Sequence, residues 1–114
     1  MTLRVVRRSY RRAGRLVPPA SRRLRSRSMI LKPGQSVEWH STGSREELLI
    51  GISGTVTLEY RACPPRQTQR RRDGPRRIRR ATLPAGGCLF LPHRIEHRVV
   101  NRASRMAHYI YLTG

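Results

Sequence analysis

Histidines and acids are scarce in this sequence, and a few of them stand at informative spacings. The chain has four histidines and six acidic residues among 114. His40 follows Gly34 after five residues, and Glu47 is followed by six residues and then Gly54. Imidazole nitrogens and carboxylate oxygens are groups that ligate divalent metal ions. We therefore ask which elements would position these side chains.

A second group with regular spacing lies nearer the C-terminus. Gly86 is followed after five residues by Pro92, and His97 and Asn101 come next. Both groups are framed by glycine or proline, which mark turns between strands. The polar residues are therefore expected at strand ends and turns.

Short strands broken by turn signals fill the chain from about residue 25 onward. The clearest alternation is at 55–60, where Val56, Leu58 and Tyr60 alternate with more polar residues. Many short strands with glycine and proline turns predict an all-β fold, a jelly roll or small barrel. The expected strands are 27–32, 36–41, 47–52, 55–60, 80–83, 88–91, 96–101 and 106–112.

Charge divides the chain into a patterned domain and basic segments. The net charge is +19, and arginine supplies nearly all of it. Residues 1–30 hold ten arginines and no acid, and residues 61–80 hold nine arginines and one acid. We expect a basic N-terminal extension at 1–24, within which 1–20 contribute one edge strand. The domain is expected at 25–114, interrupted by a basic loop at 61–77.

The two groups of spaced residues resemble the two sequence motifs of the cupin superfamily, and the chain resembles a small single-domain member (a monocupin). The first motif reads Gly-x5-His-x-His-x(3,4)-Glu-x6-Gly, and the second reads Gly-x5-Pro-x-Gly-x2-His-x3-Asn. The places of the first motif hold Gly34, His40, Thr42, Glu47 and Gly54. Those of the second hold Gly86, Pro92, Arg94, His97 and Asn101. The resemblance implies a cupin jelly-roll barrel.

The resemblance also implies a site for one divalent metal ion on His40, Glu47 and His97. Two imidazoles with one carboxylate suit Fe(II) with open positions, and Mn, Zn, Ni and Co fit the same ligands. Thr42 stands where the family has another histidine ligand, and we expect its hydroxyl to orient an exogenous ligand. Arg94 replaces a turn glycine, and we expect the turn to adopt a different geometry there.

Other polar residues are expected to lie outside the metal site. Strand alternation turns Glu46 away from Glu47 and Trp39 away from His40. His93 is expected in an exposed turn. His108 is either a satisfied interior histidine or a second-shell residue of the cavity.

Two functions follow as hypotheses. The first is a metal-binding cupin, in one version an enzyme acting on a small polar metabolite. The alternative is a non-catalytic ligand-binding or sensory cupin whose basic segments contact nucleic acid or an acidic partner. The resemblance also implies pairing of barrels into a homodimer. We expect no membrane partner, because no apolar run is long enough to span one, and we expect a cytoplasmic location because Cys63 and Cys88 form no disulfide framework.

Overall fold

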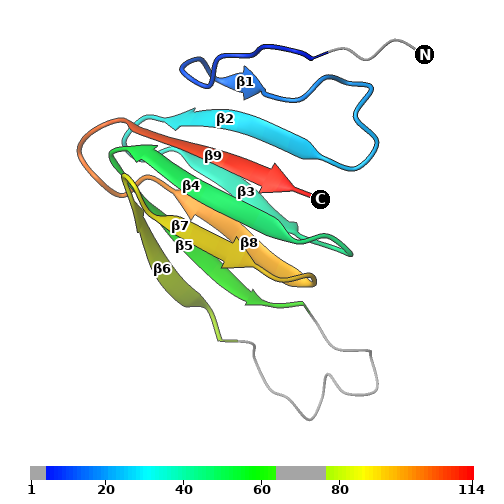
Figure 1. Cartoon of the computed structure of the whole chain (residues 1–114). Helices are drawn as coiled ribbons and strands as arrows, with labels where there is room; N and C mark the ends of the chain where they lie inside the picture. The colour runs from blue at the N-terminus through cyan, green and yellow to red at the C-terminus, as the bar shows by residue number, and fades with distance from the viewer. Residues whose placement is uncertain (1–4, 64–76) are drawn as a thin grey trace, which may run out of the picture.

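The computed structural model describes residues 5–63 and 77–114, which form two facing antiparallel sheets (Figure 1). One sheet has the order β1-β2-β9-β4-β7, and the other has the order β3-β8-β5-β6. The strands are β1 (Gly14–Arg15), β2 (Arg25–Leu31), β3 (Ser36–Ser41), β4 (Glu47–Ser53), β5 (Thr55–Ala62), β6 (Arg79–Pro84), β7 (Cys88–Leu91), β8 (Ile95–Val100) and β9 (Ala107–Thr113). The described part of the chain offers no helix that could cross a membrane.

The core lies between the sheets and follows from the period-two pattern of the strands. In β5 the expected alternation places Val56 and Leu58 inside. From the facing sheet, Leu49 and Tyr109 are 1% and 2% exposed. Burial of such apolar side chains contributes roughly 1.5–3 kcal/mol each. The buried cluster comprises Leu31, Leu49, Val56, Leu58, Leu83, Leu91, Val99, Ala107 and Tyr109.

The predicted all-β jelly roll is confirmed, and all eight predicted strands occur with small shifts at their ends. The edge strand expected in the N-terminal segment is also present, because Gly14 pairs with Ser28 and Arg15 with Arg27. The predicted basic loop falls largely on 64–76, outside the described residues. The domain boundary at residue 24 stays a prediction.

Asn101, the last residue of the second motif, stabilises the end of the barrel opposite the candidate metal ligands. Its side chain is fully buried and donates hydrogen bonds to the carbonyls of Leu31 and Arg105. Its backbone exchanges hydrogen bonds with the β2–β3 turn, accepting from Gly34 and donating to Gln35. An amide that meets so many backbone groups is a structural residue.

Arg94 occupies the left-handed conformation that glycine adopts in the motif. Its φ is +59°, and it is the one non-glycine residue with positive φ in the described part of the chain. Its N–H donates to the carbonyl of Gly43, and its carbonyl accepts from Cys63. These bonds hold the turn in place, so our expectation of a different geometry is wrong. The left-handed conformation costs an L-residue roughly 1–2 kcal/mol.

Glu59 is buried on the outer side of the β3-β8-β5-β6 sheet beneath arginines. Its carboxylate receives Nε of Arg98 at 2.6 Å, Nε of Arg80 at 2.9 Å and Nη2 of Arg102 at 3.2 Å. Burial acts to raise the pKa of Glu59. The hydrogen bonds from Arg98 and Arg80 and the charges of Arg98 and Arg102 outweigh it, so the pKa is lowered.

Replacing Arg94 with glycine should stabilise the fold. Glycine adopts positive φ without steric conflict, so we expect Arg94→Gly to raise the free energy of unfolding by about 1 kcal/mol, measured by chemical denaturation. Arg94→Ala is the control, because alanine keeps the steric conflict. Equal stability of the two variants would contradict the assignment of strain to this turn.

Replacing Glu59 with glutamine should change how stability depends on pH. Because folding lowers the pKa of Glu59, its contribution is present above the unfolded-state pKa and is lost as the pH falls through the folded-state pKa. Screening of the half-exposed arginines limits the contribution to about 1 kcal/mol at neutral pH. We expect Glu59→Gln to lose less stability than the wild type on acidification. Glu46→Gln, which removes an exposed glutamate, is the matched control, and the same pH profile for both variants would contradict this account.

Candidate metal centre

His40 reaches the barrel interior because of an irregularity in β3. Val37 and His40 both line the same cavity, although residues three apart in a regular strand face opposite sides. The register of β3 against β8 shifts between these two residues, and His40 then pairs with His97. Such a bulge re-aims the side chains that follow it.

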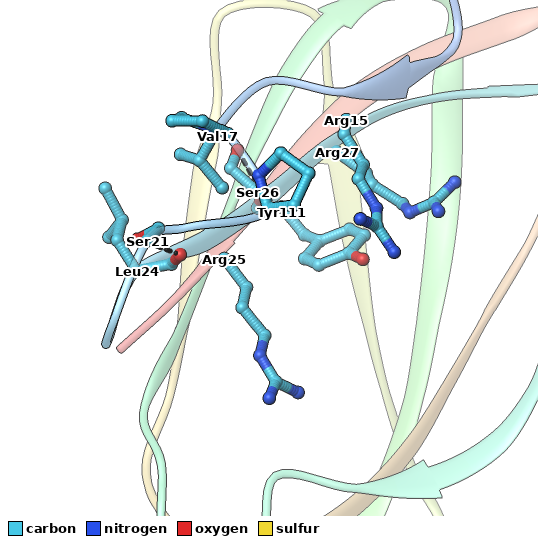
Figure 2. A pocket seen from close by; sticks show the side chains of 10 residues that line it. Arg15, Val17, Ser21, Leu24, Arg25, Ser26, Arg27 and Tyr111 are labelled. Carbon is cyan, nitrogen blue, oxygen red and sulfur yellow. Dashed lines mark hydrogen bonds between the residues drawn. The ribbon is translucent and has the colours of Figure 1, made fainter. Parts of the chain in front are cut away.

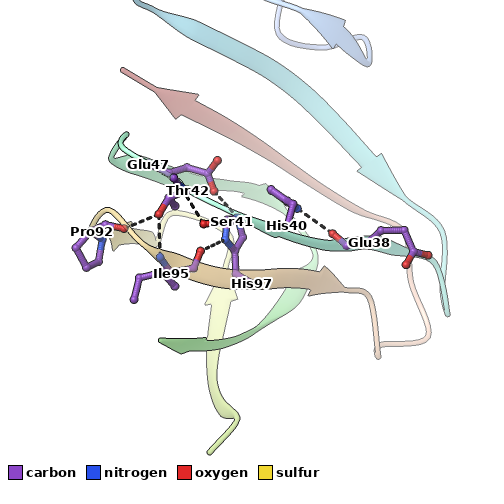
Figure 3. Close-up of polar contacts among 9 residues, drawn as sticks. Glu38, His40, Ser41, Thr42, Glu47, Pro92, Ile95 and His97 are labelled. Atoms are coloured by element: carbon purple, nitrogen blue, oxygen red, sulfur yellow. Dashed lines mark hydrogen bonds and ion pairs between the residues drawn. The ribbon is translucent and has the colours of Figure 1, made fainter. Parts of the chain in front are cut away.

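Glu47 and His97 approach each other from opposite sheets. Glu47 begins β4 and His97 lies in the middle of β8, and both side chains are buried. Oε2 of Glu47 lies 2.9 Å from Nε2 of His97 (Figure 3). The distance is that of a hydrogen bond, yet within the described part of the chain Nε2 makes no hydrogen bond of acceptable geometry. Two ligand atoms of one cation lie at such a separation.

Backbone carbonyls fix the protonation of both imidazoles. Nδ1 of His40 lies 2.8 Å from the carbonyl oxygen of Glu38, and Nδ1 of His97 lies 3.3 Å from that of Ile95. A carbonyl only accepts hydrogen bonds, so each Nδ1 is the donor to its carbonyl, and Nε2 is the ring nitrogen left for a metal ion. Metal-ligating histidines are commonly oriented in this way.

The three side chains fit a divalent metal ion. Their ligand atoms lie within 4.8 Å of one another, and the two imidazole centroids are 4.1 Å apart. The ligand atoms of one ion at typical bond lengths lie about 3 Å apart, so a small side-chain rotation is enough to bring all three atoms to this separation. His40 is exposed and has room to make that rotation.

A cavity of about 290 Å³ opens beside the three side chains. Leu49, Val99 and Tyr109 form part of its wall. Burial raises the pKa of the Tyr109 hydroxyl, and the charge of Glu47 raises it further. Tyr109 therefore keeps its proton at neutral pH.

Thr42 does not have the role that we expected. Its hydroxyl donates to the carbonyl of Pro92 at 2.9 Å and accepts from the N–H of Ile95 at 3.0 Å. Both hydrogen bonds tie the β3–β4 turn to the β7–β8 turn (Figure 3). The hydroxyl is thus occupied by the backbone, and its expected role in orienting an exogenous ligand is wrong.

The remaining histidines lie outside the cavity. His93 is exposed, as expected. His108 faces away from the cavity, where its Nε2 contacts the Ser28 hydroxyl and its ring lies 6.2 Å from that of Tyr10. The side chains of β9 that line the cavity come from alternate positions, Tyr109, Tyr111 and Thr113, and exclude His108. The position at the cavity that we considered for His108 is therefore wrong.

Trp39 and Glu46 also lie outside the cavity. The Trp39 ring stacks under the guanidinium of Arg61, 4.4 Å from its centroid. Glu46 is exposed at the end of the β3–β4 turn. Both placements agree with the expectation that neither residue reaches the metal site.

Three arginines at the cavity were missed from the sequence. Arg25, Arg27 and Arg45 line it together with the three candidate ligands. The sequence contained a signal for Arg25 and Arg27. Leu31 and Met29 pack inward, and period-two alternation along the strand places residues 27 and 25 on the same face. We placed both residues in the domain, and Arg27 in the strand 27–32, but counted them only as part of the basic charge of residues 1–30.

Comparisons with known proteins agree on the fold. No protein-family model and no curated protein sequence matches the chain. A cupin 2 conserved barrel domain protein from Salinispora arenicola matches with a TM-score of 0.61 and 24% identity, covering 99% of this chain and 87% of that one. Oxalate oxidase in complex with the substrate analogue glycolate matches with a TM-score of 0.64 and 13% identity, over 79% of this chain and 41% of that one.

A third solved structure is Drosophila melanogaster CENP-C bound to CAL1. It matches with a TM-score of 0.61 and 13% identity, over 80% of this chain and 60% of that one. This chain covers between 41% and 60% of the length of three matched structures, which is less than two thirds. At these identities the likeness concerns the fold alone. On its two-sheet topology and these likenesses, the chain is a small cupin-fold protein.

Proposed function

We propose that this chain binds one divalent metal ion on His40, Glu47 and His97 and holds a small polar metabolite at the open coordination positions. The observation that carries the proposal is the buried contact of Glu47 with Nε2 of His97, which is close but not hydrogen-bonded. The matched oxalate oxidase with glycolate supports small-molecule chemistry as a use of this fold.

The protein's own residues prepare the site for such chemistry. An ion on three protein ligands would supply a Lewis acid with positions open to a ligand. The carbonyls of Glu38 and Ile95 hold the two imidazole rings through Nδ1, which leaves Nε2 of each ring for the ion. Tyr109 remains protonated and is a hydrogen-bond donor at the cavity wall. Leu49 and Val99 restrict water on the side of the core.

Loss of His97 should abolish metal binding. We expect wild-type protein purified without added metal to contain close to one equivalent of a divalent metal by elemental analysis, and His97→Ala to contain almost none. Metal at about a hundredfold excess over its dissociation constant stabilises the folded state by about 2.7 kcal/mol. Removal by a chelator should therefore lower the melting temperature of the wild type and leave that of His97→Ala unchanged.

His93→Ala is the matched control, because it removes an exposed histidine that does not line the cavity, and this variant should keep its metal. The proposal is wrong if the wild type holds substoichiometric metal and His97→Ala alters neither metal content nor melting temperature.

A second candidate function rests on the outer side of the β3-β8-β5-β6 sheet. There Arg61 and Arg98 lie over the Trp39 ring, 4.4 and 5.6 Å from its centroid. Four arginines, Arg61, Arg80, Arg98 and Arg102, form ion pairs there with two acids, Glu59 and Glu96, so this face is cationic. The matched CENP-C structure has a protein partner, CAL1. On this reading the barrel is a non-catalytic binding module, and the face contacts nucleic acid or an acidic partner.

A salt series with random duplex DNA tests the second candidate. If the face binds phosphates, the logarithm of the association constant should fall linearly with the logarithm of salt concentration, by about 0.9 per phosphate contacted. Arg61→Gln should then weaken binding and reduce the slope, whereas Arg105→Gln, at the other end of β8, should change it less. If the protein does not bind DNA, or if the association constant does not depend on salt concentration, the proposal that this face binds nucleic acid is wrong.

A further inference from the structure

A second cavity lies against the one that holds the candidate metal ligands. Its volume is about 440 Å³, and the N-terminal segment forms one wall through Arg15 and Val17 (Figure 2). Both cavities are lined by Arg25, Arg27 and Tyr111. They therefore meet along the inner face of β2 and β9.

The charged side chains that line these two cavities are mostly positive. Four arginines line them, and Glu47 is the one acidic residue among the lining residues. Within residues 5–63 and 77–114, no carboxylate forms an ion pair with any of the four; they are Arg15, Arg25, Arg27 and Arg45. With Glu47 ionised, these four arginines and the one glutamate give the cavities a net charge of +3 before any metal ion is added.

Two of these arginines stand directly opposite each other. Arg15 on β1 is the cross-strand partner of Arg27 on β2. Like charges at such positions destabilise a strand pair. Figure 2 shows both guanidinium groups directed past the Tyr111 ring. An oxyanion between them would replace the repulsion by charge-assisted hydrogen bonds, and guanidinium groups match carboxylates in bidentate geometry.

The sheet register sets the distance from this cluster to the candidate metal ligands. Arg25 pairs with Thr113, and Thr113 pairs with Glu47. Two strand spacings separate Arg25 from Glu47, which places their Cα atoms about 10 Å apart. Arg25 and Glu47 line the same cavity, and this separation leaves room between them for a small molecule with an anionic group at each end.

We infer that the joined cavities bind a small dicarboxylate, with one carboxylate toward His40, Glu47 and His97 and the other held by Arg25 and Arg27. Arg15, contributed by the N-terminal segment, closes the outer side of this second position. The inference deepens the proposed function and rests on it only for the end of the ligand near the metal ligands.

Calorimetric titration of the full chain with succinate tests the inference, with and without one equivalent of Mn²⁺. We expect saturable binding of succinate and none of succinamide, its neutral analogue. Arg27→Gln should weaken succinate binding about tenfold and leave Mn²⁺ affinity unchanged. Arg27→Lys should recover part of the loss, because lysine restores the charge without the planar fork.

Arg105→Gln is the matched control, because it removes one exposed arginine from the β8–β9 loop at the opposite end of the barrel. The chain carries a net charge of +19, so unspecific attraction of anions must be distinguished from a site. Equal weakening by Arg27→Gln and Arg105→Gln would overturn the inference. Tighter binding of inorganic phosphate than of succinate would overturn the choice of a dicarboxylate.

The two proposals fail separately in this experiment. If Mn²⁺ binds and succinate does not, the dicarboxylate site is wrong and the metal centre stands. If His97→Ala and the wild type both lack Mn²⁺ affinity, the metal centre is wrong. Succinate binding that depends on Arg27 in metal-free protein would then still support the arginine end of the site.

Discussion

The contact of Glu47 with His97 joins the two sheets at the open end of the barrel. A buried carboxylate has lost most of its hydration, and its imidazole neighbour does not replace that loss by a well-aligned hydrogen bond. The surrounding structure is arranged about this pair. Thr42 ties together the two turns beside it, and backbone carbonyls hold the imidazole rings from behind. The open end therefore holds a buried carboxylate without a well-aligned hydrogen-bond donor, whereas the closed end is held by the neutral amide network of Asn101.

Much of the fold was readable from the sequence. Period-two alternation and glycine or proline turns predicted the strands, and motif spacing predicted that His40, Glu47 and His97 lie close together. Spacing succeeds here because turn lengths and strand pairing fix which residues meet at one end of a barrel. It also indicated Asn101, although not that this residue is structural.

The errors arose where local bonding, rather than residue type, decides the outcome. The hydroxyl of Thr42 is consumed by two backbone groups from another turn, which no local pattern reveals. Arg94 keeps the glycine conformation because the hydrogen bonds to Gly43 and Cys63 hold its backbone in place. The arginines of β2 were missed because charge was given more weight than alternation, and only the sheet register shows that Arg25 and Glu47 share a row.

The short β1 strand has a consequence for association between molecules. It covers only two of the seven residues of β2, so much of that edge lacks a strand partner among the described residues. A sheet edge is a template for pairing with another chain, and inward-pointing charges are one means by which proteins discourage it. Arg25 and Arg27 supply such charges on β2. The two side chains to which we assign a ligand thus also protect the edge, and neutralising both would leave it prone to aggregation.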